Sequence, residues 1–101
     1  MFYIYILYSS SSDKFYVGYS NDPWRRLIEH NSKPFNTFTS KYRPWDLKSV
    51  FACSENEGET MRIEKFIKKQ KSKKLIQKLT EESYVPIGEL ALLVRVPHLR
   101  D

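Results

Sequence analysis

The sequence predicts an α/β (α+β) fold: a small sandwich whose central three-stranded antiparallel sheet is flanked by helices, in the order β-β-α-β-α-α. Two runs rich in aromatic and β-branched residues, separated by a short polar segment, predict an antiparallel strand pair. Capping residues followed by apolar residues at helical spacing predict the helices. The chain has 101 residues, of which 41% are hydrophobic and 15% aromatic. That length and composition suit one folded domain with one core.

The predicted strand pair covers residues 2–8 and 14–20, with the polar segment SSSSDK between them. Successive side chains of a strand point to opposite faces of a sheet. One side of the first strand therefore carries Tyr3, Tyr5 and Leu7, and one side of the second carries Tyr16, Gly18 and Ser20. The connection predicts a hairpin.

A helix is predicted over residues 23–31. Asp22 suits the N-cap, and Pro23 suits the first helical position, where its missing N–H leaves no bond unmade. The apolar residues Trp24, Leu27 and Ile28 predict the buried stripe.

Two arginines stand side by side on this helix. At i,i+4 spacing, Arg25 pairs with Glu29, whereas Arg26 pairs with His30 on a different flank. We therefore expect Arg26 to remain available for an anion. His30 is expected at the helix end, where an imidazolium is favourable.

The rest of the chain predicts one loop, one strand and two helices. Residues 31–44 are longer than an ordinary connection and predict a functional loop. Its candidate phosphate-binding residues are Lys33, Thr39, Ser40, Lys41 and Arg43. A strand is predicted over 47–53 and a helix over 56–70, with Ser54 and Glu57 as a capping box. Ser72 suits the cap of a helix over 72–80. Residues 81–101 form a tail whose apolar run could be a short helix or a strand, and the pattern does not decide between them.

Positive charge is concentrated in residues 62–78. The chain has a net charge of +5, with 17 Lys and Arg against 12 Asp and Glu. This segment alone holds eight of the basic residues and one acid, Glu64. Such a cluster can neutralise several backbone phosphates and so favours nucleic-acid binding over a lysine-rich solvated helix face.

The cysteine and hydropathy patterns bear on the compartment. The single Cys53 allows no internal disulfide, and two histidines are too few to form a Cys/His zinc cluster with it. The apolar run FYIYILY is too short for a signal or membrane segment. A cytoplasmic protein is expected.

Several motifs in order resemble the GIY-YIG nuclease family, especially its small single-domain bacterial members. They are YIY at 3–5, YVG at 16–18, RRLIEH at 25–30 and Glu64 in RIEKFIKK. Tyr3 stands where the family has a glycine. The resemblance covers about residues 2–78 and implies a nuclease-like domain over 1–80, with 81–101 as the tail.

The resemblance implies a role for five residues. Tyr5 and Tyr16 are then the active-site tyrosines, Arg26 the essential arginine, His30 a supporting residue and Glu64 the metal ligand. Arg26 lies ten residues after Tyr16, which is the family's spacing and favours Arg26 over Arg25.

The implied chemistry is metal-dependent hydrolysis of a phosphodiester. A carboxylate with water and substrate oxygens suits Mg²⁺ or Mn²⁺. An arginine offers a planar, charged donor pair to phosphate oxygens. A tyrosine hydroxyl could handle the proton of the attacking water, Tyr16 rather than Tyr5. Taken alone, however, Glu64 is better explained by a helix ion pair with Lys68, and only the joint arrangement of the motifs favours a metal ligand.

The expected partner is nucleic acid, DNA rather than RNA, in repair or processing. The expected contacts are Lys41, Arg62, Lys65, Lys68, Lys69, Lys71, Lys73 and Lys74. A homodimer or a protein partner that supplies specificity is compatible with so small a chain. The alternative function is a non-catalytic nucleic-acid-binding module of the same fold. A third option, an RNA-recognition sheet suggested by KFYVGY, conflicts with two strands preceding the first helix.

Overall fold

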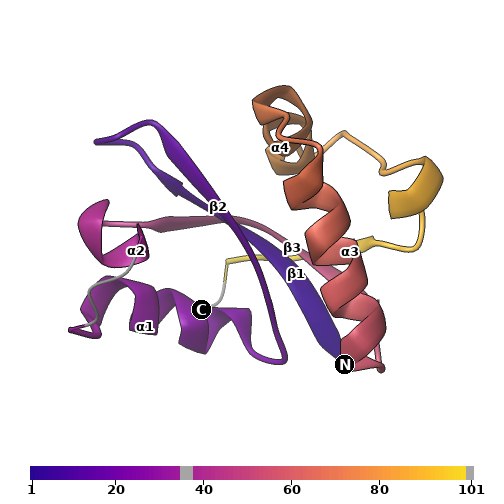
Figure 1. The fold of residues 1–101 in the computed structure, drawn as a ribbon, viewed down its shortest axis with the longest axis horizontal. Helices are drawn as coiled ribbons and strands as arrows, with labels where there is room; N and C mark the ends of the chain where they lie inside the picture. Colours follow the sequence, from indigo (N-terminus) through magenta and orange to yellow (C-terminus); the bar gives the residue numbers. More distant parts are fainter. Residues whose placement is uncertain (35–37, 100–101) are drawn as a thin grey trace.

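Four antiparallel strands form the central sheet in the computed structural model, which describes residues 1–34 and 38–99. The strands are β1 (Phe2–Ser9), β2 (Lys14–Ser20), β3 (Asp46–Ser54) and β4 (Val94–Val96). They lie in the order β2-β1-β3-β4, so that β2 and β4 are the edges (Figure 1). The predicted α+β class is confirmed.

The fourth strand corrects the prediction of a three-stranded sheet. Val94–Val96 pairs antiparallel with β3, with Val50 opposite Val96 and Ala52 opposite Val94. Three residues are too few to show the alternation by which a strand is recognised in a sequence. The tail also contributes Leu90 and Leu93 to the core, where they are 3% and 4% exposed.

The three predicted helices begin and end close to their predicted positions, and the described residues form two further short helices that were not predicted. In chain order, the helices are α1 (Pro23–Ser32), α2 (Phe38–Lys41), α3 (Glu57–Lys69), α4 (Lys73–Thr80) and the short 3-10 helix η1 (Gly88–Leu90). None of these described helices has the length and hydrophobicity that a membrane crossing requires.

Side chains cap three of the helices, two of them as predicted. The side chains of Asp22 and Ser72 accept hydrogen bonds from backbone N–H groups of α1 and α4. The predicted capping box at α3 is wrong. There Asn56 is the cap and accepts from the N–H of Glu59 at 2.9 Å, while Ser54 accepts from the N–H of Asn56 at 3.0 Å. Asn56 is itself a strong capping residue, so Ser54 is left to stabilise the preceding turn.

The predicted loop over 31–44 contains a short helix. Residues 31 and 32 extend α1, and α2 occupies Phe38–Lys41. Residues 35–37 of this segment lie outside the described residues.

The two faces of the sheet are covered by different helices. One face packs against α1 and α2, and its core contains Tyr5, Leu7 and Trp45. The other packs against α3, α4 and η1, and its core contains Ile4 and Ile63 (Figure 1). Tyrosine and isoleucine alternate along β1 and point to opposite faces, and both kinds of residue are buried because helices cover the sheet on both sides.

One residue of the predicted stripe on α1 points the wrong way. Ile28 is 67% exposed, whereas Pro23 and His30 are buried. The helix is thus rotated so that positions 23, 27 and 30 face the sheet, which brings a histidine into the core where an isoleucine was expected.

Candidate active site

The site begins with a close contact between β1 and β2. Tyr5 lies opposite Gly18 and Leu7 lies opposite Tyr16, and this register places both tyrosines on the face covered by α1. A Cβ atom built on Gly18 would lie 2.5 Å from both Cζ and Oη of Tyr5. Gly18 is therefore required because the phenol ring of Tyr5 occupies the space of its side chain.

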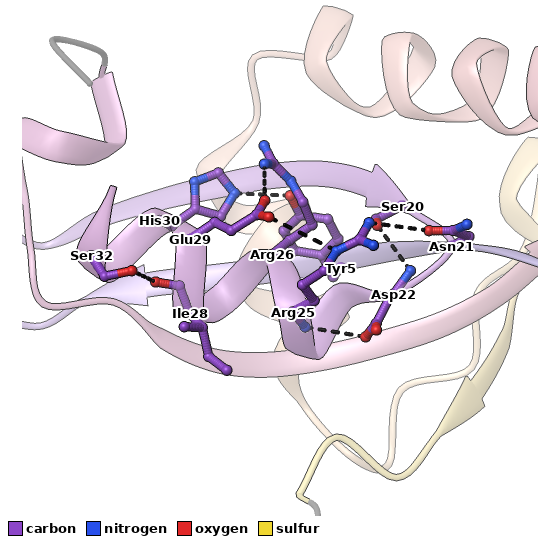
Figure 2. A network of polar contacts seen from close by, with 10 residues as sticks. All are labelled: Tyr5, Ser20, Asn21, Asp22, Arg25, Arg26, Ile28, Glu29, His30 and Ser32. Atoms are coloured by element: carbon purple, nitrogen blue, oxygen red, sulfur yellow. Dashed lines mark hydrogen bonds and ion pairs between the residues drawn. The ribbon is translucent and has the colours of Figure 1, made fainter. Parts of the chain in front are cut away.

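Tyr5 and His30 form a buried polar pair. Tyr5 Oη lies 2.9 Å from His30 Nε2, and the two residues are 1% and 6% exposed (Figure 2). Burial raises the pKa of the Tyr5 phenol, and the nearby Tyr16 adds to that effect. Burial, together with the Arg26 charge, lowers the pKa of His30 to about 4. Both groups are therefore uncharged at neutral pH.

The buried histidine corrects the expectation of a helix-end imidazolium. His30 does occupy the last turn of α1, but its ring points into the core instead of toward water. Desolvation disfavours a charged imidazole more strongly than the helix terminus favours it. His30 acts here as a neutral hydrogen-bonding partner of Tyr5.

The two arginines of α1 also differ from the prediction. Arg26 Nη1 lies 2.5 Å from Glu29 Oε1, whereas Arg25 Nε lies 3.9 Å from Glu29 Oε2 (Figure 2). Arg26, expected to be free, is thus the closer partner of Glu29. Burial by itself would lower the pKa of Arg26, but the contacts with Glu29 and Tyr5 outweigh it and raise that pKa. The guanidinium is a permanent charge at the boundary of the core.

Glu64 approaches the same region from the opposite side of the sheet. It lies on α3 with its side chain 15% exposed, and its Oε1 is 3.4 Å from Lys68 Nζ. Lys68 Nζ in turn lies 5.4 Å from the centre of the Tyr16 ring. The ion pair expected on α3 therefore forms, and it forms beside a predicted active-site tyrosine.

An open groove brings the predicted residues together. A hollow of about 540 Å³ is lined by residues that include Tyr5, Tyr16, Arg26, Glu64 and Glu57. Its lining comes from β1, β2, α1 and α3, so it lies around the edge strand β2 and joins the two faces of the sheet. His30 does not line this groove but supports Tyr5 from behind.

Glu57 is a groove residue that the sequence reasoning missed. Its Oε2 accepts a hydrogen bond from Tyr19 Oη at 3.2 Å. Glu57 stands seven residues before Glu64 on α3, a spacing that places both on one side of a helix. This seven-residue spacing is the feature of the sequence from which Glu57 could have been predicted.

The donors in the groove are compatible with a magnesium-type ion. Among residues 1–34 and 38–99, no three His, Cys, Asp or Glu side chains gather closely enough to hold a metal by themselves. A tetrahedral zinc site would need such a set. Mg²⁺ is commonly held by one or two carboxylates, with water and substrate phosphate completing its shell. Glu64 fits this second pattern.

Six of the eight basic residues of 62–78 line two separate hollows. Lys68, Lys71 and Lys73 line a hollow near the start of β2, together with Lys14, which was not predicted. Arg62, Lys65 and Lys69 line a different hollow on the outer side of α3. The remaining predicted contacts, Lys41 and Lys74, are exposed. The charge that is continuous in sequence is therefore divided in space.

Two of the predicted phosphate-binding residues of the loop have structural roles. Arg43 Nε donates to the backbone oxygen of His30 at 2.5 Å, and its Nη2 donates to the backbone oxygen of Lys33. Thr39 is buried, and its backbone oxygen accepts from Trp45 Nε1 at 2.7 Å. Arg43 thus closes the end of α1 against the following segment.

An antiparallel sheet flanked by helices carries an arginine, a tyrosine and a carboxylate around one groove, an arrangement compatible with phosphodiester chemistry. The family model of the GIY-YIG catalytic domain matches residues 1–79. The chain belongs to the GIY-YIG family, which is of nuclease type. The search among curated proteins gave no match.

Proposed function

We propose that this protein is a metal-dependent endonuclease that hydrolyses phosphodiester bonds in nucleic acid, DNA by preference, in repair or processing. The observation that carries this proposal is the convergence of Tyr16, Arg26 and Glu64 on one groove from three separate elements. The stability of the fold does not require a tyrosine, an arginine and a carboxylate to line the same open hollow.

Each of the three residues has a separate task. Arg26, which keeps its charge at any accessible pH, binds the oxygens of the scissile phosphate. Tyr16 stands at the same groove and handles the proton of the attacking water. Glu64 would hold Mg²⁺ or Mn²⁺, which supplies polarisation of the phosphate and stabilisation of the leaving oxygen.

Tyr5 and His30 are positioning residues in this proposal. The pKa of Tyr5 is raised by burial, which makes its phenolate harder to form than that of an exposed tyrosine. The uncharged pair of Tyr5 and His30 instead fixes the ring beneath Gly18 and beside Arg26. This difference in environment favours Tyr16 as the residue that handles the proton.

Lys68 is the cation best placed to contact the nucleic-acid backbone near the groove. It lies beside Tyr16 and Glu64, and the hollow lined by Lys14, Lys71 and Lys73 continues from it. Phosphates on either side of the scissile one can bind there. The outer group of Arg62, Lys65 and Lys69 comes into contact where the nucleic acid extends over α3.

The alternative function, a nucleic-acid-binding module without catalysis, is favoured by one observation. Arg26 and Glu64 already have internal ion-pair partners, Glu29 and Lys68. If these pairs were structural, the groove would bind a phosphate backbone without cutting it.

A cleavage assay with matched variants separates the two functions. Wild type is incubated with labelled duplex, branched, nicked and single-stranded DNA and RNA, with Mg²⁺, with Mn²⁺ and with chelator. We expect cleavage that requires metal, loss of cleavage in Arg26→Ala and Glu64→Gln, and near-normal cleavage in Arg25→Ala and Glu59→Gln. Titration calorimetry should show that Glu64→Gln loses Mn²⁺ affinity but still binds nucleic acid. Cleavage by Glu64→Gln at the wild-type rate in Mg²⁺ would contradict the proposal.

A further inference from the structure

A second, smaller cavity lies next to the groove. It has a volume of about 260 Å³, and its lining includes Tyr16 and Arg26 as well as Phe38, Thr39 and Arg43. Tyr16 and Arg26 therefore line both hollows, and the smaller one also contains Glu29. The larger hollow contains the carboxylates Glu57 and Glu64. A phosphate held by Arg26 would lie where the two hollows meet.

The smaller cavity contains an aromatic ring that is both exposed and held in place. Phe38 is 46% exposed. Its ring centre lies 4.9 Å from that of Tyr42 and 6.1 Å from that of Trp45. It also lies 6.4 Å from the ring centre of Tyr16, with only 27° between the two planes. Three neighbouring rings thus hold Phe38 and leave part of its surface open.

Three of the polar residues of the cavity, Arg43, Glu29 and His30, are already engaged within the protein. Arg43 donates to two backbone oxygens, and Glu29 is bonded to Arg26. His30 contacts Tyr5 and is uncharged at neutral pH. These bonds leave the open surface of Phe38 as the main feature that a ligand can contact. A flat apolar group is better suited to it than a second phosphate.

We infer that this cavity binds the base of an unpaired nucleotide adjoining the phosphate at Arg26. The inference rests on the proposed function, because that function places a phosphate at Arg26. Every base has an apolar face that can stack on an aromatic side chain without sequence preference. The cavity is slightly smaller than the range of about 300 to 1,000 Å³ typical of sites for drug-sized ligands, which suits a single base.

The cavity also selects a class of substrate. A base in a regular duplex must leave its stack and its partner before it can enter a protein pocket, and this costs free energy. The cost is smallest for a base that is already unpaired. Single strands, flaps and bulges next to the cleaved bond are therefore the preferred substrates, and fully paired duplex is the poorer one.

The test is a binding experiment in chelator, which prevents cleavage. The probe is a single-stranded DNA oligonucleotide containing the fluorescent base 2-aminopurine, whose emission falls when it stacks. We expect quenching with wild type and with Phe38→Tyr, and loss of quenching with Phe38→Leu. Affinity for the single strand should fall about 5- to 140-fold in Phe38→Leu, the range that corresponds to loss of one stacked base.

Two controls separate stacking from general damage. Ile28→Ala removes another exposed apolar side chain of the same layer and should leave quenching unchanged. A matched duplex should bind Phe38→Leu and wild type with similar affinity, and circular dichroism should show that Phe38→Leu is folded. Equal quenching by Phe38→Leu and wild type, or equal weakening of duplex and single-strand binding, would overturn the inference.

The outcome for the cavity is distinguishable from the outcome for the nuclease. If Phe38→Leu cuts single-stranded and duplex DNA as wild type does while Arg26→Ala cuts neither, the base cavity is refuted and the nuclease stands. If wild type quenches the probe in a Phe38-dependent way but cuts no substrate with any metal, the base cavity stands and the nuclease is refuted.

Discussion

The buried His30 should make the stability of this protein fall at a pH where most other side chains do not titrate. The perturbation is a decrease in pH from about 7.5 to about 4.5, applied to wild type and to His30→Gln. In the unfolded chain a histidine binds a proton near its ordinary pKa of 6.5, whereas in the folded protein the pKa of His30 is about 4. Between these values the unfolded state binds more protons than the folded state, so stability falls as pH falls.

The size of the effect follows from the two pKa values. The stability due to neutral His30 is fully present above pH 6.5 and is lost as pH falls toward about 4. By linkage, the free energy of unfolding should fall by about 1.5 to 2.5 kcal/mol between about pH 7.5 and about pH 4.5. The lower figure applies where water near the ring reduces the desolvation of His30. The pKa of Glu29 is held below its ordinary 4.5 by Arg26, so its own contribution is lost at lower pH.

The assay is urea unfolding followed by circular dichroism at several pH values. Glutamine can still hydrogen-bond the Tyr5 hydroxyl but does not titrate, so His30→Gln should show a much smaller decrease across the same range. The quantity compared is the decrease in the free energy of unfolding of each protein between the two pH values, not its absolute stability. If wild type and His30→Gln lose equal stability between about pH 6.5 and about pH 4.5, His30 is not buried as a neutral group, and the explanation of its pKa fails.

Two further substitutions test other parts of the site. Gly18→Ala places a Cβ 2.5 Å from the Tyr5 ring and should destabilise the protein by about 1 to 3 kcal/mol in thermal unfolding, so an unchanged melting temperature would show that Tyr5 can move aside. Lys68→Gln should reduce the slope of log affinity for duplex DNA against log salt by about one unit, whereas Lys65→Gln on the outer side of α3 should change it less. The opposite ranking of the two lysines would place the nucleic acid on the outer face.

Local sequence patterns were enough to predict much of the fold. Asp22 and Ser72 cap helices as expected, because a capping side chain bonds to backbone only two or three residues away. The alternation along each strand grouped Tyr5 with Leu7 and Tyr16 with Gly18, because the strand period is a local property. The pairing register then placed both groups on one face. The short strand β4 escaped prediction because its pairing with β3 depends on a distant segment.

The sequence by itself therefore indicated the candidate site residues and, for the most part, which element each belongs to. Tertiary structure decided their environment. The rotation of α1 on the sheet buried His30 and exposed Ile28, and it placed Arg26 at the boundary of the core. The packing of α3 around the edge strand β2 brought Glu64 into one groove with Tyr16 and Arg26. A helix pattern specifies which residues share a face, but the residues that this face meets are set by packing with segments far away in the chain.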